Sequence, residues 1–302
     1  VNYVSACFGL DKWHDLPCWY MYKYAMALNA IPYLSHNLAN IIKSIYGKNK
    51  KALALDLDNT LWGGIVGDDG VDGLELGSET PTAQAYQEFQ QYIKKNKDIG
   101  VMLTVCSKND YENAIAGLNH PDSVLKPDDF LVIKANWEPK NYNIAATAKE
   151  LNIMSDAIVF VDDNPVEREI VGKSLPVAVP PMESVDKYIQ VIDRSGFFEV
   201  TALSEDDLKR NEMYKANAMR EQEMLTFADY GDYLNSLQMK AEICAFAPVY
   251  IQRIAQLTNK SNQFNVTTRR YTAEEITNVA ESDEYIDLYG KLTDKFGDNG
   301  VV

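Results

Sequence analysis

The sequence contains few of the residues that build disulfide frameworks and zinc sites. Among its 302 residues are four cysteines and three histidines. No two cysteines form a Cys-x-x-Cys pair and the histidines are scattered, which argues against a zinc site and a disulfide scaffold. This usage is typical of a reducing compartment, and we expect a cytoplasmic protein. The cysteines are Cys7, Cys18, Cys106 and Cys244.

Positive charge is scarce as well. Lys and Arg total 29 against 44 Asp and Glu, so the formal net charge is −15. Nucleic-acid binding requires cations that neutralise phosphates, and no dense basic run offsets the deficit, so we expect no nucleic-acid partner. An anionic ligand would have to be held by a metal ion, by main-chain N–H groups or by a few local cations.

Long hydrophobic runs are also missing. No apolar segment is long enough to span a membrane, and no basic-then-apolar segment indicates a signal peptide, so we expect no membrane partner. Hydrophobic residues still make up 46% of the chain, which is ample for a packed core. The chain begins at Val1 without Met, and we expect it to be a piece of a longer multidomain protein.

Four segments differ in their sequence patterns. Residues 1–47 carry apolar residues at helical spacing, which predicts a helical N-terminal extension. Residues 48–183 alternate short apolar strands with amphipathic helices. Residues 184–232 are charged and helical, as in a connector. Residues 233–302 follow a strand–helix–helix–strand–strand order that is cut short, which predicts a partial α/β domain.

The pattern of residues 48–183 predicts an α/β core with a mostly parallel sheet and helices on both faces. In such folds ligands bind at the carboxyl ends of the strands. The strands are expected at 51–56, 100–106, 130–134, 157–162 and 176–179, and the helices at 82–97, 109–118, 139–151 and 164–173. In the C-terminal segment we expect a strand at 237–246, helices at 247–264 and 272–282, the latter capped by Thr272, and a strand–turn–strand at 285–302.

Two aspartates follow the first core strand, in the stretch LALDLDNTLWGG (53–64). Because side chains alternate along a strand, Asp56 and Asp58 start on the same side. Counted from Asp56, the sixth and twelfth positions hold Leu61 and Gly67, whereas an EF-hand calcium loop needs Gly and Glu there. The remaining candidates are a solvated strand end and a magnesium site in which one carboxylate acts as nucleophile or base.

Polar residues follow the other core strands too. Ser107 ends one strand, and Asn109 is expected as the N-cap of the next helix, an arrangement suited to phosphate. Lys140 lies just inside a helix after Pro139, and Asp162 and Asp163 end the most apolar strand. Each has a structural alternative: a capping hydroxyl, a solvated lysine and an N-cap pair.

The order of these motifs resembles the haloacid dehalogenase (HAD) superfamily of aspartate-nucleophile phosphatases, with its Rossmann-like core. The stretches DLDNTLWGGIVGDDG and VFVDDNPVEREIV are similar to its FkbH-like subfamily, over residues 50–179. The likeness continues through RIAQLTNKSNQFNVTTRRYT (253–272), and the final stretch resembles the start of a GNAT (acetyltransferase-like) domain. Residues 1–47 resemble the tail of an upstream domain.

The resemblance implies a role for each acidic residue. Asp56 would be the nucleophile that forms an aspartyl phosphate. Asp58 would protonate the leaving oxygen and then activate water, while its main-chain carbonyl joins the Asp56 carboxylate on Mg²⁺. Asp163 would be a direct metal ligand. Asp162 would contact the metal ligands without binding the metal itself.

Ser107 and Lys140 would hold the phosphoryl oxygens and neutralise developing charge. Lys108 and Lys134 are rival lysines for this role, and the proline-started helix favours Lys140.

The segment after Asp58 corresponds to the flap or cap of HAD proteins. Its length leaves room for a small flap over an open site, without a large cap. Trp62, Gly63 and Gly64 are candidate substrate-binding residues, as are Thr60, which would also steady the loop, and Asn109. Trp62 could equally pack beneath the flap.

The resemblance to FkbH-like proteins also implies acyl-transfer chemistry in polyketide-type biosynthesis. A glyceryl unit from 1,3-bisphosphoglycerate would pass to a cysteine and then to the phosphopantetheine of an acyl carrier protein. Cys106 is the cysteine placed near the site, although free cysteines are commonly buried as small hydrophobes. Arg269 and Arg270 could contact the carrier or form a solvated or interface pair. Two alternatives stay open: a plain phosphatase acting on small molecules or phosphoproteins, and a phosphoacceptor or scaffold module without turnover.

Overall fold

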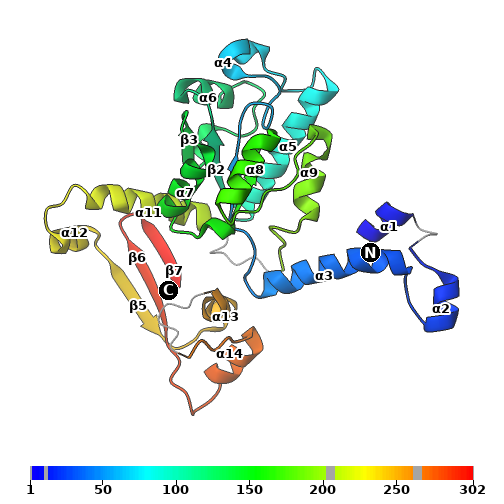
Figure 1. Ribbon diagram of the computed structural model, residues 1–302. Helices are drawn as coiled ribbons and strands as arrows, with labels where there is room; N and C mark the ends of the chain where they lie inside the picture. Colours follow the sequence, from blue (N-terminus) through cyan, green and yellow to red (C-terminus); the bar gives the residue numbers. More distant parts are fainter. Residues whose placement is uncertain (1, 10–12, 202–207, 261–266, 302) are drawn as a thin grey trace. The chain divides into compact units, whose positions relative to one another are not determined.

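The computed structural model describes residues 2–9, 13–201, 208–260 and 267–301 (Figure 1). The chain divides into two compact units: Val1–Asn49 with Glu199–Thr201, and Lys50–Phe198 with Ala202–Val302. Among the described residues, no helix combines the length and the apolar character needed to cross a bilayer.

The first unit is helical, in accord with the pattern of residues 1–47. It contains α1 (Asn2–Phe8), α2 (Leu16–Tyr22) and α3 (Ile31–Ile45). The Asp15 carboxylate caps α2 by accepting a hydrogen bond from the Cys18 N–H at 3.0 Å. Val4 of α1 packs in a small apolar cluster with Ala27 and Ala30 of the segment that leads into α3.

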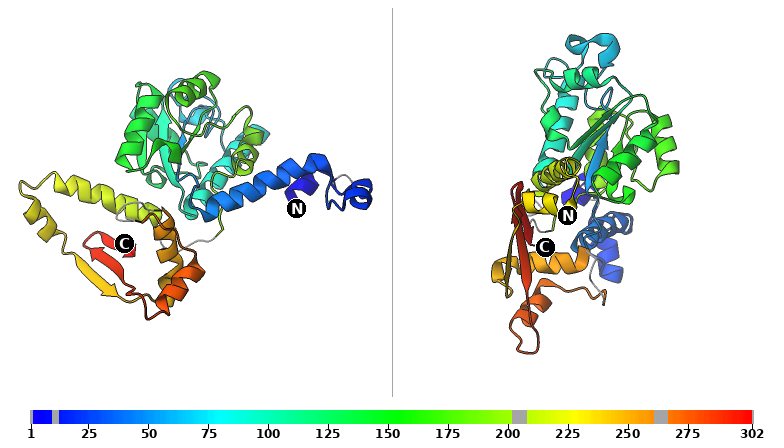
Figure 2. Two further views of the ribbon diagram at one scale, coloured as in Figure 1. Left: turned by 60° about the horizontal axis from the view of Figure 1, so that its bottom comes forward. Right: turned by 90° about the vertical axis from the view of Figure 1, so that its left-hand side faces the viewer.

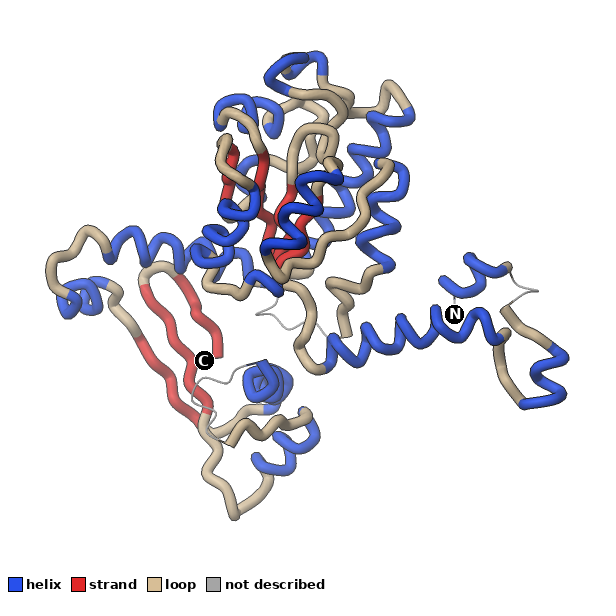
Figure 3. The backbone as a smooth tube through the Cα atoms, viewed as in Figure 1, coloured by secondary structure: helices blue, strands red, loops and turns tan. Residues whose placement is uncertain are grey.

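The core of the second unit is a four-stranded parallel sheet in the order β3-β2-β1-β4. The strands are β1 (Ala52–Leu55), β2 (Met102–Ser107), β3 (Val132–Ala135) and β4 (Ile158–Val161), drawn in red in Figure 3. The expected strand at 176–179 is wrong: only Ala178 pairs, in a single bridge to Val159. Pro176 and Pro180 flank this bridge and lack the N–H donors that would extend a ladder.

Helices cover both faces of this sheet, as the right-hand view of Figure 2 shows. Alternate strand residues point to opposite faces, so Leu53 and Val159 enter one apolar cluster while Ala54 and Phe160 enter the other. The first cluster includes residues of α5 (Pro81–Asp98), α6 (Tyr111–Leu118) and α9 (Val185–Arg194); the second includes residues of α7 (Lys140–Glu150) and α8 (Pro165–Ser174). The predicted α/β class, with helices on both faces of a parallel sheet, is confirmed.

Side-chain caps start two of these helices. The Thr80 hydroxyl caps α5 and the Asn164 side chain caps α8, each followed by a proline in the first turn. The expected cap at Asn109 is wrong, since α6 begins at Tyr111 with Asp110 in the N-cap position. The Asn109 amide instead hydrogen-bonds to Asp58, which draws it away from the helix.

The C-terminal part of the second unit builds a separate antiparallel sheet in the order β5-β6-β7. The Thr272 hydroxyl caps α14 in a capping box with Glu275, as predicted. The expected helix at 247–264 begins with a 3₁₀ turn and continues as α13; positions 261–264 lie outside the described residues, as do 202–207 of the connector. The elements are α11 (Arg210–Met224), α12 (Tyr230–Ser236), β5 (Lys240–Cys244), α13 (Ile251–Lys260), α14 (Ala273–Ala280), β6 (Tyr289–Asp294) and β7 (Gly297–Val301).

Short helical turns complete the described chain. One of them, α4 (Val66–Asp69), lies in the loop after β1. The 3₁₀ helices are Leu28–Ala30, Val71–Gly73, Pro127–Asp129, Ser155–Ala157 and Pro248–Tyr250.

Candidate active site

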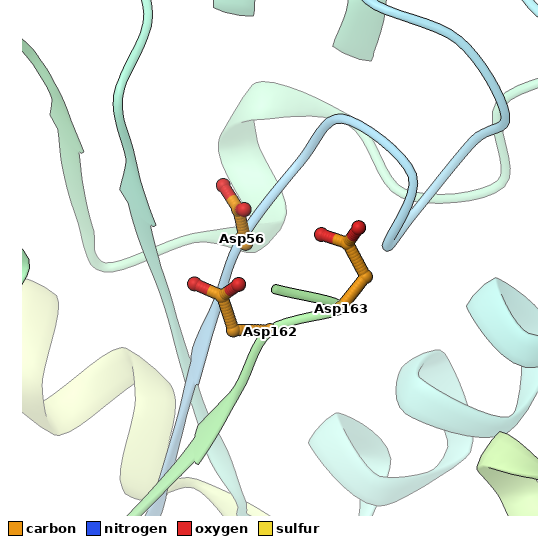
Figure 4. A group of neighbouring side chains, drawn as sticks. All are labelled: Asp56, Asp162 and Asp163. Atoms are coloured by element: carbon orange, nitrogen blue, oxygen red, sulfur yellow. The ribbon is translucent and has the colours of Figure 1, made fainter. Parts of the chain in front are cut away.

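Three carboxylates meet at the carboxyl edge of the core sheet (Figure 4). Asp56 follows β1, while Asp162 and Asp163 follow its neighbour β4, and the Asp56 N–H donates to the Val161 carbonyl at 2.9 Å. One carboxylate oxygen from each residue lies within 4.8 Å of the other two. Asp162 is fully buried and Asp56 is 7% exposed. Three oxygen donors gathered in this way could hold a metal ion.

Lys140 brings a positive charge to this group. It is the first residue of α7 and is 4% exposed, and its Nζ lies 2.7 Å from Asp56 Oδ2 and 2.6 Å from Asp162 Oδ2. The two rival lysines pair elsewhere, Lys108 with Glu167 and Lys134 with Glu150. Lys140 is therefore the one of the three lysines that contacts the acidic group.

Burial and mutual repulsion both act on the carboxylates. Burial, followed by the charge of Asp56, raises the pKa of Asp162 to about 6 and also raises the pKa of Asp163. Burial alone would lower the pKa of the Lys140 ammonium, but the adjacent Asp56 and Asp162 outweigh it and raise that pKa. Lys140 offers one positive charge against three carboxylates, which favours a further cation here.

Asp58 lies beside this group and is held by N–H donors on both carboxylate oxygens. Its Oδ1 accepts from the Trp62 indole at 2.9 Å and from the Val66 N–H at 3.1 Å. Its Oδ2 accepts from the Asn109 amide at 2.9 Å. Burial raises the pKa of Asp58, although the bonds from Val66 and Trp62 act in the opposite direction. A carboxyl group whose pKa is raised by burial and lowered by hydrogen bonds is suited to exchanging a proton.

The turn after Asp58 ties β1 to the rest of the site. Asn59 adopts a left-handed conformation (φ 55°), and its side-chain oxygen accepts from the Gly64 N–H at 3.1 Å. The Thr60 hydroxyl accepts from the Asp163 N–H at 3.2 Å. Thr60 therefore joins the two loops that carry the acidic residues.

The flap is the short segment of chain from Trp62 to Glu75. Gly63 pairs with Glu75 through two main-chain hydrogen bonds of 3.1 and 2.9 Å, which closes the flap at its base. Gly64 has φ 95°, in the region where glycine carries no steric penalty. The Trp62 side chain is fully buried. Its position fits the alternative that it packs beneath the flap.

Ser107 and Cys106 lie side by side on β2 in different surroundings. Ser107 ends the strand, is almost fully buried, and accepts a hydrogen bond at its main-chain carbonyl from the Asn136 N–H at 3.2 Å. Cys106 points into the apolar cluster beneath α7 and is 1% exposed. Burial raises the pKa of its thiol to about 12. A thiol in such surroundings is a poor nucleophile, so the position of Cys106 does not favour an acyl acceptor.

Some residues that organise the site were not recognised in the sequence. Arg168 donates through Nη1 to the main-chain carbonyls of Asp162 (2.8 Å), Asp163 (2.6 Å) and Met182 (2.9 Å), which fixes the loop after β4. Tyr86 donates its hydroxyl proton to the Asn59 carbonyl at 3.2 Å. Both residues lie on helices as ordinary members of amphipathic patterns, so no local signal marked them.

Arg269 and Arg270 lie in the C-terminal part, where Arg269 stacks over the Tyr271 ring at 4.7 Å.

Fold and site together define a Rossmann-like α/β core with an acidic candidate metal centre. No protein-family model matches the chain, and no curated protein matches it. Among solved structures, the chain is similar to the N-terminal part of the protein BF1531 from Bacteroides fragilis, described as containing a phosphatase domain complexed with Mg. The identity is 38% and the TM-score 0.63, over 67% of this chain. The chain spans about half (55%) of the length of that structure.

Proposed function

We propose that the chain is a Mg²⁺-dependent phosphoryl hydrolase of the HAD type, working through an aspartyl phosphate at Asp56. The observation that carries the proposal is the meeting of Asp56, Asp163 and Lys140 at one sheet edge, with Asp58 beside them. The similarity to a phosphatase domain complexed with Mg supports it. Hydrolysis of phosphate esters or acyl phosphates fits these residues, since nucleophile, acid and cation are all present.

The donor set fits magnesium. Mg²⁺ prefers oxygen ligands and is usually bound by one or two carboxylates together with water and substrate phosphate. The Asp162 oxygens are engaged by the Asn164 N–H at 2.8 Å and by Lys140 at 2.6 Å. Asp163 is not engaged by Lys140, and the resemblance to HAD proteins implies Asp56, Asp163 and the Asp58 main-chain carbonyl as the ligands. When bound, Mg²⁺ would neutralise negative charge on the phosphoryl oxygens.

The residues of the chain would then act in two steps. In the first, an Asp56 carboxylate oxygen attacks phosphorus, the bond from phosphorus to the leaving oxygen breaks, and Asp58 gives that oxygen its proton. In the second, Asp58 takes a proton from water, the water oxygen attacks phosphorus, and phosphate leaves Asp56. Lys140 and Ser107 hold phosphoryl oxygens in both steps.

The test is phosphate release from 4-nitrophenyl phosphate in the presence and absence of Mg²⁺. We expect multiple turnovers that need the metal and that are abolished by Asp56→Asn, together with a phosphoryl adduct on Asp56 in quenched wild-type samples. Asp156→Asn is the matched control, because Asp156 is exposed and precedes β4 at the opposite edge of the sheet. Turnover that survives Asp56→Asn would contradict the mechanism. An adduct without turnover would favour the phosphoacceptor module.

A finer version of this function is the FkbH-type acyl transfer. In it a glyceryl group from 1,3-bisphosphoglycerate passes to an acyl carrier protein, and residues 233–302 act as the start of a GNAT-like domain. This version rests on sequence resemblance, and the burial of Cys106 weighs against a thioester there. Mass spectrometry after incubation with 1,3-bisphosphoglycerate tests it: a glyceryl adduct on Cys106 or on the carrier protein supports the transfer, and phosphate release without any adduct supports a plain phosphatase.

A further inference from the structure

Asp58 is held from two separate elements, the flap and the loop between β2 and α6. Trp62 and Val66 of the flap donate to Oδ1, and Asn109 of the loop donates to Oδ2. A carboxylate oxygen that already accepts two N–H donors has little room for a proton, whereas an oxygen with one donor keeps a lone pair available. The oxygen that carries and delivers the proton is therefore Oδ2.

We propose that Asn109 is a positioning residue that aims Asp58 Oδ2 at the leaving oxygen. The inference rests on the proposed function and extends it to a residue that does not touch the reacting atoms. By occupying one lone pair of Oδ2, the Asn109 amide fixes the direction of the other. General-acid catalysis depends on such alignment, because a proton is passed efficiently only within hydrogen-bond geometry.

The orientation of Asn109 follows from its own contacts. Its side-chain oxygen accepts from the Asp110 N–H at 2.9 Å, and a main-chain N–H can only donate. The NH₂ group must therefore be the end that faces Asp58. Asn109 is 4% exposed, so water does not compete for this amide. The side chain is fixed at both ends, which is what a positioning residue requires.

Trp62 fixes the opposite side of the same carboxylate. Its ring is fully buried, and a Cβ added to Gly117 of α6 would lie 2.8 Å from it, so ring and helix are in close contact. The indole N–H is a donor only, and it is satisfied by Asp58 Oδ1. Asp58 is thereby held between the flap and the loop before α6, and its carboxylate cannot rotate without breaking one of these hydrogen bonds.

A merely structural role for Asn109 makes a different prediction from a positioning role. Phenyl phosphate and 4-nitrophenyl phosphate are close in size, but phenolate is the poorer leaving group and needs the proton from Asp58 more. kcat/KM covers the steps up to departure of the leaving group, so it reports the proton transfer to the leaving oxygen. Loss of alignment should slow phenyl phosphate selectively, whereas loss of folded protein slows both substrates equally.

The experiment compares Asn109→Leu with wild type on both substrates, with Mg²⁺ present. General-acid catalysis is typically worth about 10²–10⁴-fold, so we expect kcat/KM for phenyl phosphate to fall at least about tenfold more than for 4-nitrophenyl phosphate. Trp62→Phe, which removes the indole donor and keeps an aromatic ring, should give the same selective loss. Asn96→Leu is the matched control, since Asn96 is a buried amide that donates to the Tyr92 carbonyl on α5.

The outcomes separate the two proposals. A selective loss in Asn109→Leu, absent from Asn96→Leu, supports the positioning role. Equal losses on both substrates, or no loss, overturn it while leaving the phosphatase intact. A wild-type chain that hydrolyses neither substrate, or an active Asp56→Asn variant, overturns the proposed function itself.

Discussion

Replacement of Lys140 by Met tests the electrostatic account of the site without requiring any substrate. The change removes the ammonium and keeps much of the side-chain volume. It leaves Asp56 and Asp162, which lie 2.7 and 2.6 Å from Lys140 Nζ, without their buried partner. We expect a large loss of stability, because a buried charge without a partner costs far more than the pair itself contributes.

The size of the loss can be worked from the geometry. Unit charges 2.7 and 2.6 Å apart, as in the two Lys140 ion pairs, attract by about 6 kcal/mol each at an effective dielectric constant near 20, and the cost of desolvation offsets part of this. Breaking a buried ion pair by removing one partner typically costs about 3–5 kcal/mol. For Lys140→Met we expect the free energy of unfolding to fall by about 4 kcal/mol at about pH 8, without Mg²⁺.

The loss should depend on pH with a definite sign. Burial and the charge of Asp56 raise the pKa of Asp162 to about 6 in the folded protein. The folded state therefore binds more protons than the unfolded state between the ordinary carboxyl pKa and about pH 6, and stability falls as pH rises through that window. Without Lys140 the pKa of Asp162 in the folded protein rises further. The pH range over which stability falls therefore extends to higher pH. The difference from wild type should thus be larger at about pH 8 than at about pH 5, where Asp162 is protonated.

Urea unfolding followed by circular dichroism at the two pH values measures this difference. Lys108→Met is the control, because Lys108 is 41% exposed and pairs with Glu167 at the surface. Surface pairs contribute about 0–1 kcal/mol, so this variant should lose little at either pH. Equal losses in the two variants, or a larger Lys140→Met loss at the lower pH, would refute the reasoning.

Two further predictions concern the flap contact and the buried thiol. Gly117→Ala places a Cβ 2.8 Å from the Trp62 ring, so thermal unfolding should show a loss of about 1–3 kcal/mol, and an unchanged midpoint would contradict the close contact. With a thiol reagent on the folded protein, the exposed Cys7 and Cys244 should react while Cys106 stays unmodified until urea is added, as peptide mass spectrometry can check. Rapid labelling of Cys106 would reopen its role as an acyl acceptor.

The class of the core could be predicted because burial on both faces leaves a strong local pattern. Stretches such as 158–161 (IVFV) are apolar at every position, as strands covered on both sides must be. The strand predicted at 176–179 was wrong because the apolar VAV was given more weight than the prolines on either side of it, which limit the pairing to a single bridge. The strand order β3-β2-β1-β4 has no local signal at all, since it depends on contacts between distant segments.

Positions in the candidate site were predictable where residues directly follow strands or, as for Lys140, begin a helix after a proline. Asp56 and Asp162 meet because their strands are neighbours in a parallel sheet, so the ends of those strands share an edge. The partner of Asn109 was not predictable, because a helix-capping rule considers only the adjacent backbone. In the fold a carboxylate distant in sequence, that of Asp58, competes for the amide.

The charge balance of the site explains why a phosphate group would not bind to it unaided. Asp56, Asp162 and Asp163 bring three carboxylates to one sheet edge, Asp58 lies beside them, and the Lys140 ammonium pairs with Asp56 and Asp162. A phosphate ester adds further negative charge within a few ångströms, where each like-charge pair costs several kcal/mol at an effective dielectric constant of about 20. A divalent cation held by Asp56 and Asp163, as proposed, would be attracted both to these carboxylates and to the phosphate and would offset the repulsion between them. In this mechanism the metal ion must therefore bind before the phosphate or together with it.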